Sequence, residues 1–188
     1  MSRAASRIHG VPRTRTQLQR EAKVEEIAAA AAERLRERGY DGLSVVGVAR
    51  DLGLAQNAVY WYFPSKDHLF VAALERMLRE IHARKPPPQR ALEKKVLFFV
   101  EQLDALADVR AAMYDRARVS PVVAEFVEQL DALWRRMLTN VLRDKVPPGE
   151  LEPTVDTLLA TFQGALLRPH APDDLRRTVR YALRRLVG

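Results

Sequence analysis

The chain has 188 residues, a net charge of +7 and no cysteine, and its residues are 47% apolar and 29% charged. This length and composition indicate one large or two small globular domains, and they exclude a disordered chain. The lack of cysteine excludes disulfides, thiolate nucleophiles and cysteine-ligated metals. The longest apolar runs, such as Ile27–Ala32, are too short to cross a bilayer, and none follows the charged N-terminus as in a secretion signal. We therefore expect a soluble, cytoplasmic protein without a membrane partner.

Positive charge is concentrated at the N-terminus. The first 20 residues hold five arginines and no acidic residue, whereas residues 21–83 hold eight basic and ten acidic side chains. We predict that residues 1–19 form a basic, flexible arm that orders on a polyanion. A tail that only improves solubility is the alternative that composition leaves open.

Apolar residues recur at helical spacing along nearly the whole chain, and no segment alternates with period two over the length of a strand. In chain order, the pattern predicts helices over residues 18–38, 44–52 and 56–63, and from Ser65 to about Ile81. Three prolines at 86–88 cannot continue a helix and mark a boundary. Further helices are expected over about 89–106, 110–118, 121–146, 153–167 and 172–186. The predicted fold class is all-α, with about nine helices.

Residues 44–63, SVVGVARDLGLAQNAVYWYF, carry the most informative motif. The order of helix, glycine turn and helix is that of a helix-turn-helix, whose second helix enters the major groove of DNA. Val48, Leu52 and Val59 are spaced to pack inward. The side chains left on the outside form a large aromatic surface for so short a helix: Gln56, Asn57, Ala58, Tyr60, Trp61 and Tyr62. Such a surface indicates a docking partner, although burial of Trp61 and Tyr62 in the core remains the alternative.

Residues 43–70 resemble the TetR/AcrR family of bacterial transcriptional regulators. The shared features are a serine cap, an apolar-alanine pair, a glycine turn, Tyr-x-x-Phe and a downstream Lys-x-x-Leu, and the specific resemblance covers about 60 residues. It implies a DNA-binding head of three helices plus a connecting helix over residues 20–84. It also implies a C-terminal helical domain over residues 86–188 for dimerisation and ligand binding.

The resemblance also assigns residues to DNA. Ser44, Tyr60 and Lys66 would contact phosphates, which fix register without reading sequence. Gln56 and Asn57 would face base edges, and Ala58 would meet a thymine methyl group. The arm would add positive charge, in the adjacent minor groove by hypothesis. The complete predicted DNA-binding set is Arg13, Arg15, Ser44, Val46, Gln56, Asn57, Ala58, Tyr60, Trp61 and Lys66.

In the C-terminal half, the last two helices carry apolar stripes that the resemblance assigns to a dimer interface. These residues are Leu158, Leu159, Phe162, Leu166, Val179, Leu183 and Leu186, with an intramolecular core as the alternative. The middle helices supply the walls of a predicted effector pocket: Phe99, Leu103, Met113, Tyr114, Phe126, Trp134, Met137, Phe162 and Gln163. Arg110, Thr161 and Gln163 are its candidate polar groups, and the apolar walls suit a hydrophobic effector.

These features predict a homodimeric repressor that binds double-stranded operator DNA and is released by a small-molecule effector. Two alternatives remain: a ligand-independent architectural DNA-binding dimer, and a helical enzyme or protein-binding module with a vestigial head. The four histidines are scattered, and no phosphate-binding loop or nucleophile elbow occurs. We therefore predict no catalytic residue, no metal site and no cofactor.

Overall fold

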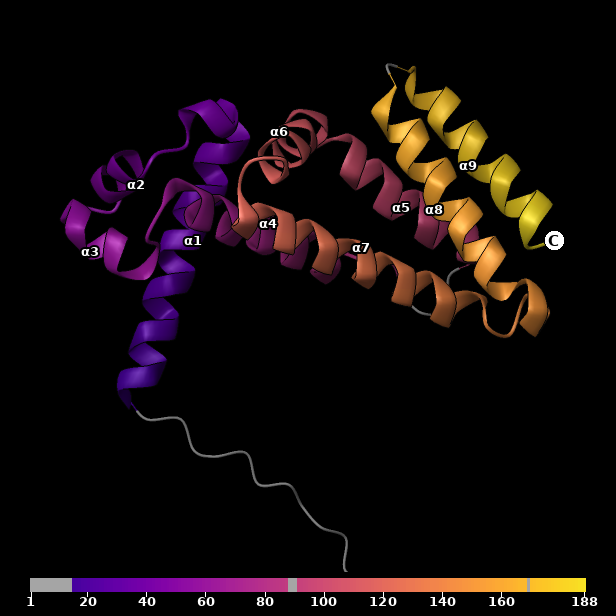
Figure 1. The fold of residues 1–188 in the computed structure, drawn as a ribbon, viewed down its shortest axis with the longest axis horizontal. Coiled ribbons are helices and arrows are strands. Elements are labelled where there is room, and N and C mark those ends of the chain that lie inside the picture. The colour runs from indigo at the N-terminus through magenta and orange to yellow at the C-terminus, as the bar shows by residue number, and fades with distance from the viewer. Residues whose placement is uncertain (1–14, 88–90, 169) are drawn as a thin grey trace, which may run out of the picture.

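A computed structural model describes residues 15–87, 91–168 and 170–188. This part of the chain contains nine α-helices, one short 3₁₀ helix and no strand, which confirms the predicted all-α class. The helices are α1 (Arg15–Gly42), α2 (Val45–Asp51), α3 (Gln56–Tyr62), α4 (Lys66–Ala83), α5 (Leu92–Asp104), α6 (Ala107–Ala117), α7 (Pro121–Leu142), η1 (Pro148–Glu150), α8 (Leu151–Leu167) and α9 (Pro172–Leu186). The fold is elongated, with α1–α3 at one end and the paired helices α8 and α9 at the other (Figure 1).

The first helix is longer than predicted. It begins at Arg15, so residues 15–19 are helical and do not belong to a flexible arm. Near its other end Gly39 has a φ of 63°, a left-handed conformation that breaks the helix where the sequence predicted it to stop. The remainder of the predicted arm, including Arg13, lies outside the described residues.

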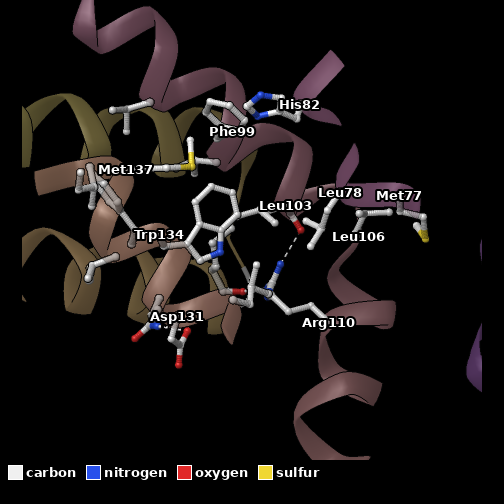
Figure 2. Close-up of a pocket in the computed structure, with 18 of the residues that line it drawn as sticks. Met77, Leu78, His82, Phe99, Leu103, Leu106, Arg110, Asp131, Trp134 and Met137 are labelled. Atoms are coloured by element: carbon white, nitrogen blue, oxygen red, sulfur yellow. Dashed lines mark hydrogen bonds between the residues drawn. The ribbon is translucent and has the colours of Figure 1, made fainter. Parts of the chain in front are cut away.

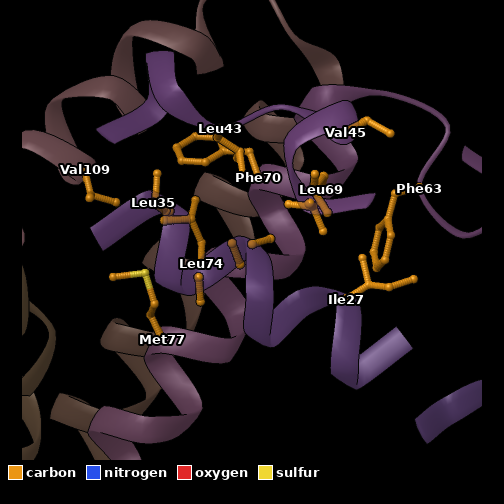
Figure 3. Close-up of a cluster of buried hydrophobic side chains, with 14 of the residues drawn as sticks. Ile27, Leu35, Leu43, Val45, Phe63, Leu69, Phe70, Leu74, Met77 and Val109 are labelled. Atoms are coloured by element: carbon orange, nitrogen blue, oxygen red, sulfur yellow. The ribbon is translucent and has the colours of Figure 1, made fainter. Parts of the chain in front are cut away.

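The buried apolar side chains form two clusters. The head cluster joins α1–α4 to α6 and the first half of α7, and Figure 3 shows several of its members, among them Leu35, Phe70 and Val109. The tail cluster joins α5, α8, α9 and Leu142 near the end of α7. The cores therefore do not divide at Pro86, because α6 and α7 follow it in sequence and still pack on the head.

Ion pairs fasten α1 to α4 on the surface of the head. Glu25 accepts hydrogen bonds from Arg79, at 2.9 Å, and from Arg76, which also donates to Glu80 at 2.7 Å. Arg36 of α1 reaches Glu80 as well. Much of the acidic charge that the head carries is therefore neutralised within the head.

Two features are absent from the described ranges. No helix in them is long and apolar enough to cross a membrane. Nor do they contain a group of three or more His, Asp or Glu side chains placed to hold a metal ion.

Candidate functional site

Helices α2 and α3 form the predicted helix-turn-helix. Gly53, with a φ of 64°, occupies the turn in a left-handed conformation that glycine adopts without strain. The backbone N–H of Leu54 donates to the carbonyl of Ala49 at 2.8 Å and closes the turn. Val59 is fully buried and anchors α3 in the head cluster. One face of α3 is thereby fixed inward and the opposite face is fixed outward.

The outward face of α3 carries the predicted DNA-contacting side chains. Trp61 is 63% exposed and Tyr60 is 41% exposed, and Val46 of α2 is 55% exposed. The other members, Gln56, Asn57 and Ala58, are exposed as well. The guanidinium carbon of Arg20 lies 4.9 Å from the centre of the Trp61 ring, which brings a positive charge to this surface.

Tyr62 differs from its predicted outward position. It is half-buried, packs against the head cluster and makes an edge contact with Trp61, with 4.7 Å between ring centres. At helical spacing Tyr62 lies three residues after Val59, which turns it toward the same inner face. The alternative of core packing therefore holds for Tyr62 and not for Trp61.

The helix starts near the predicted DNA-contacting face differ. The Ser44 hydroxyl oxygen accepts the backbone N–H of Gly47 at 3.0 Å and caps α2, so its O–H stays available as a donor. Ala55 has no side chain that can cap α3. The ammonium of Lys66 lies 4.0 Å from the centre of the Tyr40 ring, at the N-terminus of α4. The first backbone N–H groups of α3 therefore have no side-chain cap, unlike those of α2.

A buried arginine beneath α2 was missed by the sequence analysis. Arg34 is 6% exposed and forms two hydrogen bonds with the carboxylate of Asp51, one of them 2.9 Å long. These bonds from Arg34 lower the pKa of Asp51. Arg34 lies seven residues after Ile27 on the inner face of α1, so a charge on an apolar stripe was the available signal. The pair fixes the angle between α1 and α2.

Gly47 is where α2 crosses this arginine. A Cβ atom at Gly47 would lie 2.6 Å from the guanidinium carbon of Arg34 and 2.8 Å from the Ser44 hydroxyl oxygen. Only glycine leaves room for the guanidinium there. The glycine therefore serves packing inside the head and does not face outward.

A second polar cluster connects the head to α6. Asp67 accepts a hydrogen bond from the Tyr40 hydroxyl at 2.8 Å and two from the Arg116 guanidinium at 2.6 and 3.2 Å. Burial alone would raise the pKa of Asp67, but hydrogen bonds from Arg116 and two hydroxyl groups outweigh burial and lower it. Burial and the bond to Asp67 raise the pKa of Tyr40 to about 12. The cluster holds α1, α4 and α6 together through one carboxylate.

Replacing Asp67 by asparagine is expected to lower the free energy of unfolding by about 1–3 kcal/mol at neutral pH, because Arg116 and Tyr40 lose a charged acceptor. The folded-state pKa of Asp67 is lowered, so its contribution is complete above the unfolded pKa of about 3.9 and is lost as the pH falls through the folded value. Urea unfolding of both proteins over a falling pH series should therefore give converging stabilities. Asp173→Asn, at a carboxylate whose side chain is 91% exposed, should change stability by less than about 0.5 kcal/mol. A difference between wild type and Asp67→Asn that stays constant into acid would contradict this account.

A pocket of about 690 Å³ lies between the head cluster and the tail cluster. All nine residues predicted as pocket walls line it, and Figure 2 shows Phe99, Leu103, Trp134 and Met137 around it. One wall of the pocket was not predicted from the sequence, and it is formed by Leu74, Met77, Leu78 and His82 of α4. Since α4 and α6 contribute both to the pocket and to the head cluster, a ligand there would touch the head directly.

Few polar groups line the pocket. They include Arg110 and Tyr114 of α6, Asp131 of α7, and Gln163 of α8, whose amide nitrogen lies 3.4 Å from an Asp131 oxygen. Burial raises the pKa of Tyr114 and of Asp131. Thr161, a candidate polar group, lies outside this pocket, and its hydroxyl donates to its own helix at the carbonyl of Thr157.

The position of the predicted dimer residues has to be corrected. Leu158 and Val179 are fully buried in the tail cluster, and Leu183 is 6% exposed. Phe162 and Leu166 are also buried there, and Leu159 and Leu186 pack against the same cluster. These side chains join α8 to α9 within one chain, as the intramolecular alternative held, so they are not open to a second copy.

A helix-turn-helix head on a helical domain with an internal pocket defines a class of DNA-binding regulators. Residues 23–73 match the family described as "Bacterial regulatory proteins, tetR family". The chain is 30% identical over 160 residues to the HTH-type transcriptional repressor KstR of Rhodococcus jostii RHA1, which covers 80% of this chain and 76% of that protein. The chain belongs to the TetR family of transcriptional regulators.

Solved structures share the fold. A transcriptional regulator from Rhodococcus sp. RHA1 has a TM-score of 0.69 and 28% sequence identity, covering 87% of this chain and 95% of that one. A protein from Saccharomonospora viridis in complex with choline has a TM-score of 0.63 and 17% identity, covering 87% and 96%. The second resemblance concerns the fold alone.

Proposed function

We propose that this protein is a sequence-specific repressor that binds operator DNA as a homodimer and is released by a small-molecule effector. The observation that carries the proposal is the outward face of α3, where two amides and two aromatic side chains are exposed beside an anchored core residue. Gln56 and Asn57 read base edges, and Ala58 meets a thymine methyl group. A regulator of this kind works in the cytoplasm, where the chromosome lies.

Phosphate contacts fix the register of this helix on DNA. Tyr60 and Ser44 offer hydroxyl donors at the edges of the outward face, and Lys66 adds a positive charge near the start of α4. Arg20 and Arg15 lie on the exposed part of α1, and Arg20 is held over Trp61. These contacts give affinity that decreases with salt, whereas α3 gives specificity.

The proposed dimer contact moves to the outer face of α8 and α9. This face is made of exposed small and apolar side chains: Thr157, Ala160, Gly164 and Leu167 on α8, and Thr178 and Tyr181 on α9. The Thr157 hydroxyl donates to the carbonyl of Pro153 at 2.8 Å, so it needs no water when the face is covered. Small side chains allow close approach of helices from a second copy.

Ala160→Arg is expected to convert the dimer to a monomer, because a long charged side chain would have to be buried at the centre of that face. Light scattering after size-exclusion chromatography measures the mass. Ala22→Arg, at an exposed alanine on α1, is the matched control and should stay dimeric. A dimeric Ala160→Arg protein would place the interface elsewhere.

The pocket supports the effector part of the proposal. It lies where the two clusters meet, and α6 connects its wall to the Tyr40, Asp67 and Arg116 cluster at the start of α4. A relative by fold holds choline, so this architecture can take a small molecule. A ligand that binds one arrangement of α4 and α6 better than another shifts the spacing of the two heads in a dimer. A cavity of this size also disfavours the ligand-independent alternative.

Binding to a labelled DNA fragment from upstream of the protein's own gene tests the function. The titration is run at two salt concentrations, with an unrelated fragment of equal length as the control. We expect preference for the upstream fragment and weaker binding at higher salt. Absence of any binding at low salt would contradict the DNA-binding proposal and favour an enzyme or a protein-binding module.

A further inference from the structure

One charged side chain of the pocket is half-buried and has no ionic partner among the described residues. The Arg110 guanidinium donates to the carbonyl of Leu103 at 2.6 Å and to the carbonyl of Leu166. These carbonyls lie in the last turns of α5 and α8, so Arg110 caps both helices. A guanidinium has five N–H donors, so donors remain for a third acceptor. In Figure 2 the Arg110 side chain reaches from α6 into the space beside Trp134 and Leu106.

The surroundings of Arg110 favour an anion. Burial lowers the pKa of Arg110, because neighbouring apolar groups replace water around the charge. Two carbonyls satisfy hydrogen bonds but do not neutralise the cation, and the through-space attraction of Asp104, which raises the pKa of Arg110, does not outweigh burial. An anion that binds in the pocket would offset the hydration free energy that the buried guanidinium has lost.

The charged side chains of the pocket walls are mostly positive, which also favours a negatively charged ligand. Lys85, Lys95 and Arg110 line the pocket, whereas Asp131 is the one acidic side chain among its described walls. Burial raises the pKa of Asp131, which makes its negative charge easier to remove. The remaining walls are almost entirely apolar, so a suitable ligand combines one negative charge with a large apolar body.

We propose that the pocket binds an apolar monocarboxylic acid, with its carboxylate on Arg110 and its hydrocarbon body along Phe99, Trp134 and Met137. An acid with the length of a medium or long acyl chain, or with fused rings of similar bulk, matches a pocket of about 690 Å³. The inference rests on the proposed function, because it names the chemical class of the effector.

Three probes with one apolar body and different head groups test the charge preference: dodecanoate and dodecylammonium below their micellar concentrations, and dodecanol below its solubility limit. The chain contains two tryptophans, so full-length Trp61→Phe leaves Trp134 in the pocket as the fluorescent reporter. We expect dodecanoate to quench or shift this emission at concentrations at least about ten-fold lower than dodecanol, because a charge-assisted bond adds that much affinity. Dodecylammonium should bind weakest.

The variant Arg110→Gln assigns the carboxylate to its partner. Glutamine keeps donors for the carbonyls of α5 and α8 but lacks the charge, so dodecanoate affinity should fall about ten-fold or more while dodecanol affinity stays within about two-fold. Arg110→Lys keeps the charge and should retain part of the preference. Circular dichroism and the melting temperature report whether each variant is folded. If Arg110→Gln does not fold, Arg110→Lys and Asp131→Asn are compared in the same assay. Their head-group preferences then show whether Arg110 or Asp131 sets the preference for dodecanoate.

The outcomes that overturn the inference differ from those that overturn the proposed function. Ligand binding is measured without DNA, so a failure of operator binding leaves this test intact. Equal affinity for the three probes, no binding of dodecanoate, or strongest binding of dodecylammonium that Asp131→Asn abolishes would each refute the carboxylate assignment. Tight dodecanoate binding that does not release the upstream DNA fragment would keep the ligand class and remove its role as the effector.

Discussion

The double variant Gln56→Ala/Asn57→Ala is expected to lose most of its preference for operator DNA. Each bidentate contact between an amide and a base is worth about 1–3 kcal/mol, so preference over unrelated DNA should fall at least about 30-fold. Both side chains are exposed on α3, so their removal leaves the head cluster unchanged. Fluorescence anisotropy with the upstream fragment and the unrelated fragment gives the ratio.

In the same experiment, the salt dependence of affinity separates base-specific contacts from electrostatic attraction to the phosphates. Neither variant residue is charged, so the slope of log affinity against log salt should equal that of the wild type. Gln129→Ala provides the matched control, because this exposed amide on α7 bonds to Glu125 on its own helix. An unchanged preference in the double variant would remove α3 from the role of reading helix.

Gly47→Ala is expected to destabilise the head by about 1–3 kcal/mol. The added methyl group would lie 2.6 Å from the guanidinium carbon of Arg34, so the arginine must move and its pairing with Asp51 is disturbed. Ser44 must move as well, since its hydroxyl oxygen lies 2.8 Å from the same position. Without this steric conflict alanine would stabilise the helix relative to glycine. A decrease in the free energy of unfolding would therefore indicate the conflict, and an increase would indicate its absence. Chemical unfolding followed by circular dichroism measures the effect.

Two comparisons assign the cost to Arg34. Gly149→Ala places a methyl group in open space at an exposed position and should be neutral or slightly stabilising. In an Arg34→Leu background the cost of Gly47→Ala should change, and the double-mutant cycle gives the coupling between the two positions. Additive effects of the two substitutions would show that the close contact between Gly47 and Arg34 does not contribute to the free energy of unfolding.

Periodicity and turn residues predicted the helices well, because helices depend on local spacing. Nine walls named from four apolar stripes line one cavity, and Gly39, Gly53 and Ser44 occupy the structural positions expected of them. The α4 wall was not predicted, since one apolar stripe on α4 serves both the head cluster and the pocket. The local sequence of an apolar stripe does not show whether the stripe packs in a core or lines a pocket.

Predictions that depended on long-range partners failed more often. The stripe on α8 and α9 was assigned to a second copy, yet Leu158 and Val179 meet each other's helices within one chain. Arg34 and Asp51 are 17 residues apart, and Asp67 and Arg116 are 49 apart, so no spacing rule joins them. A charged residue on an apolar stripe is a signal that a partner exists, but it does not name that partner.

The cavity at the boundary of the two clusters also has an expected mechanical consequence. Side chains that line a cavity have fewer dispersion contacts than side chains in a filled core, so we expect this boundary to be more compliant than either cluster. A bound molecule would supply such contacts and make this boundary, the joint between the head cluster and the tail cluster, more rigid. Operator affinity would then depend on the stiffness of this joint as well as on its angle, and ligands of one chemistry but different bulk would act with graded strength.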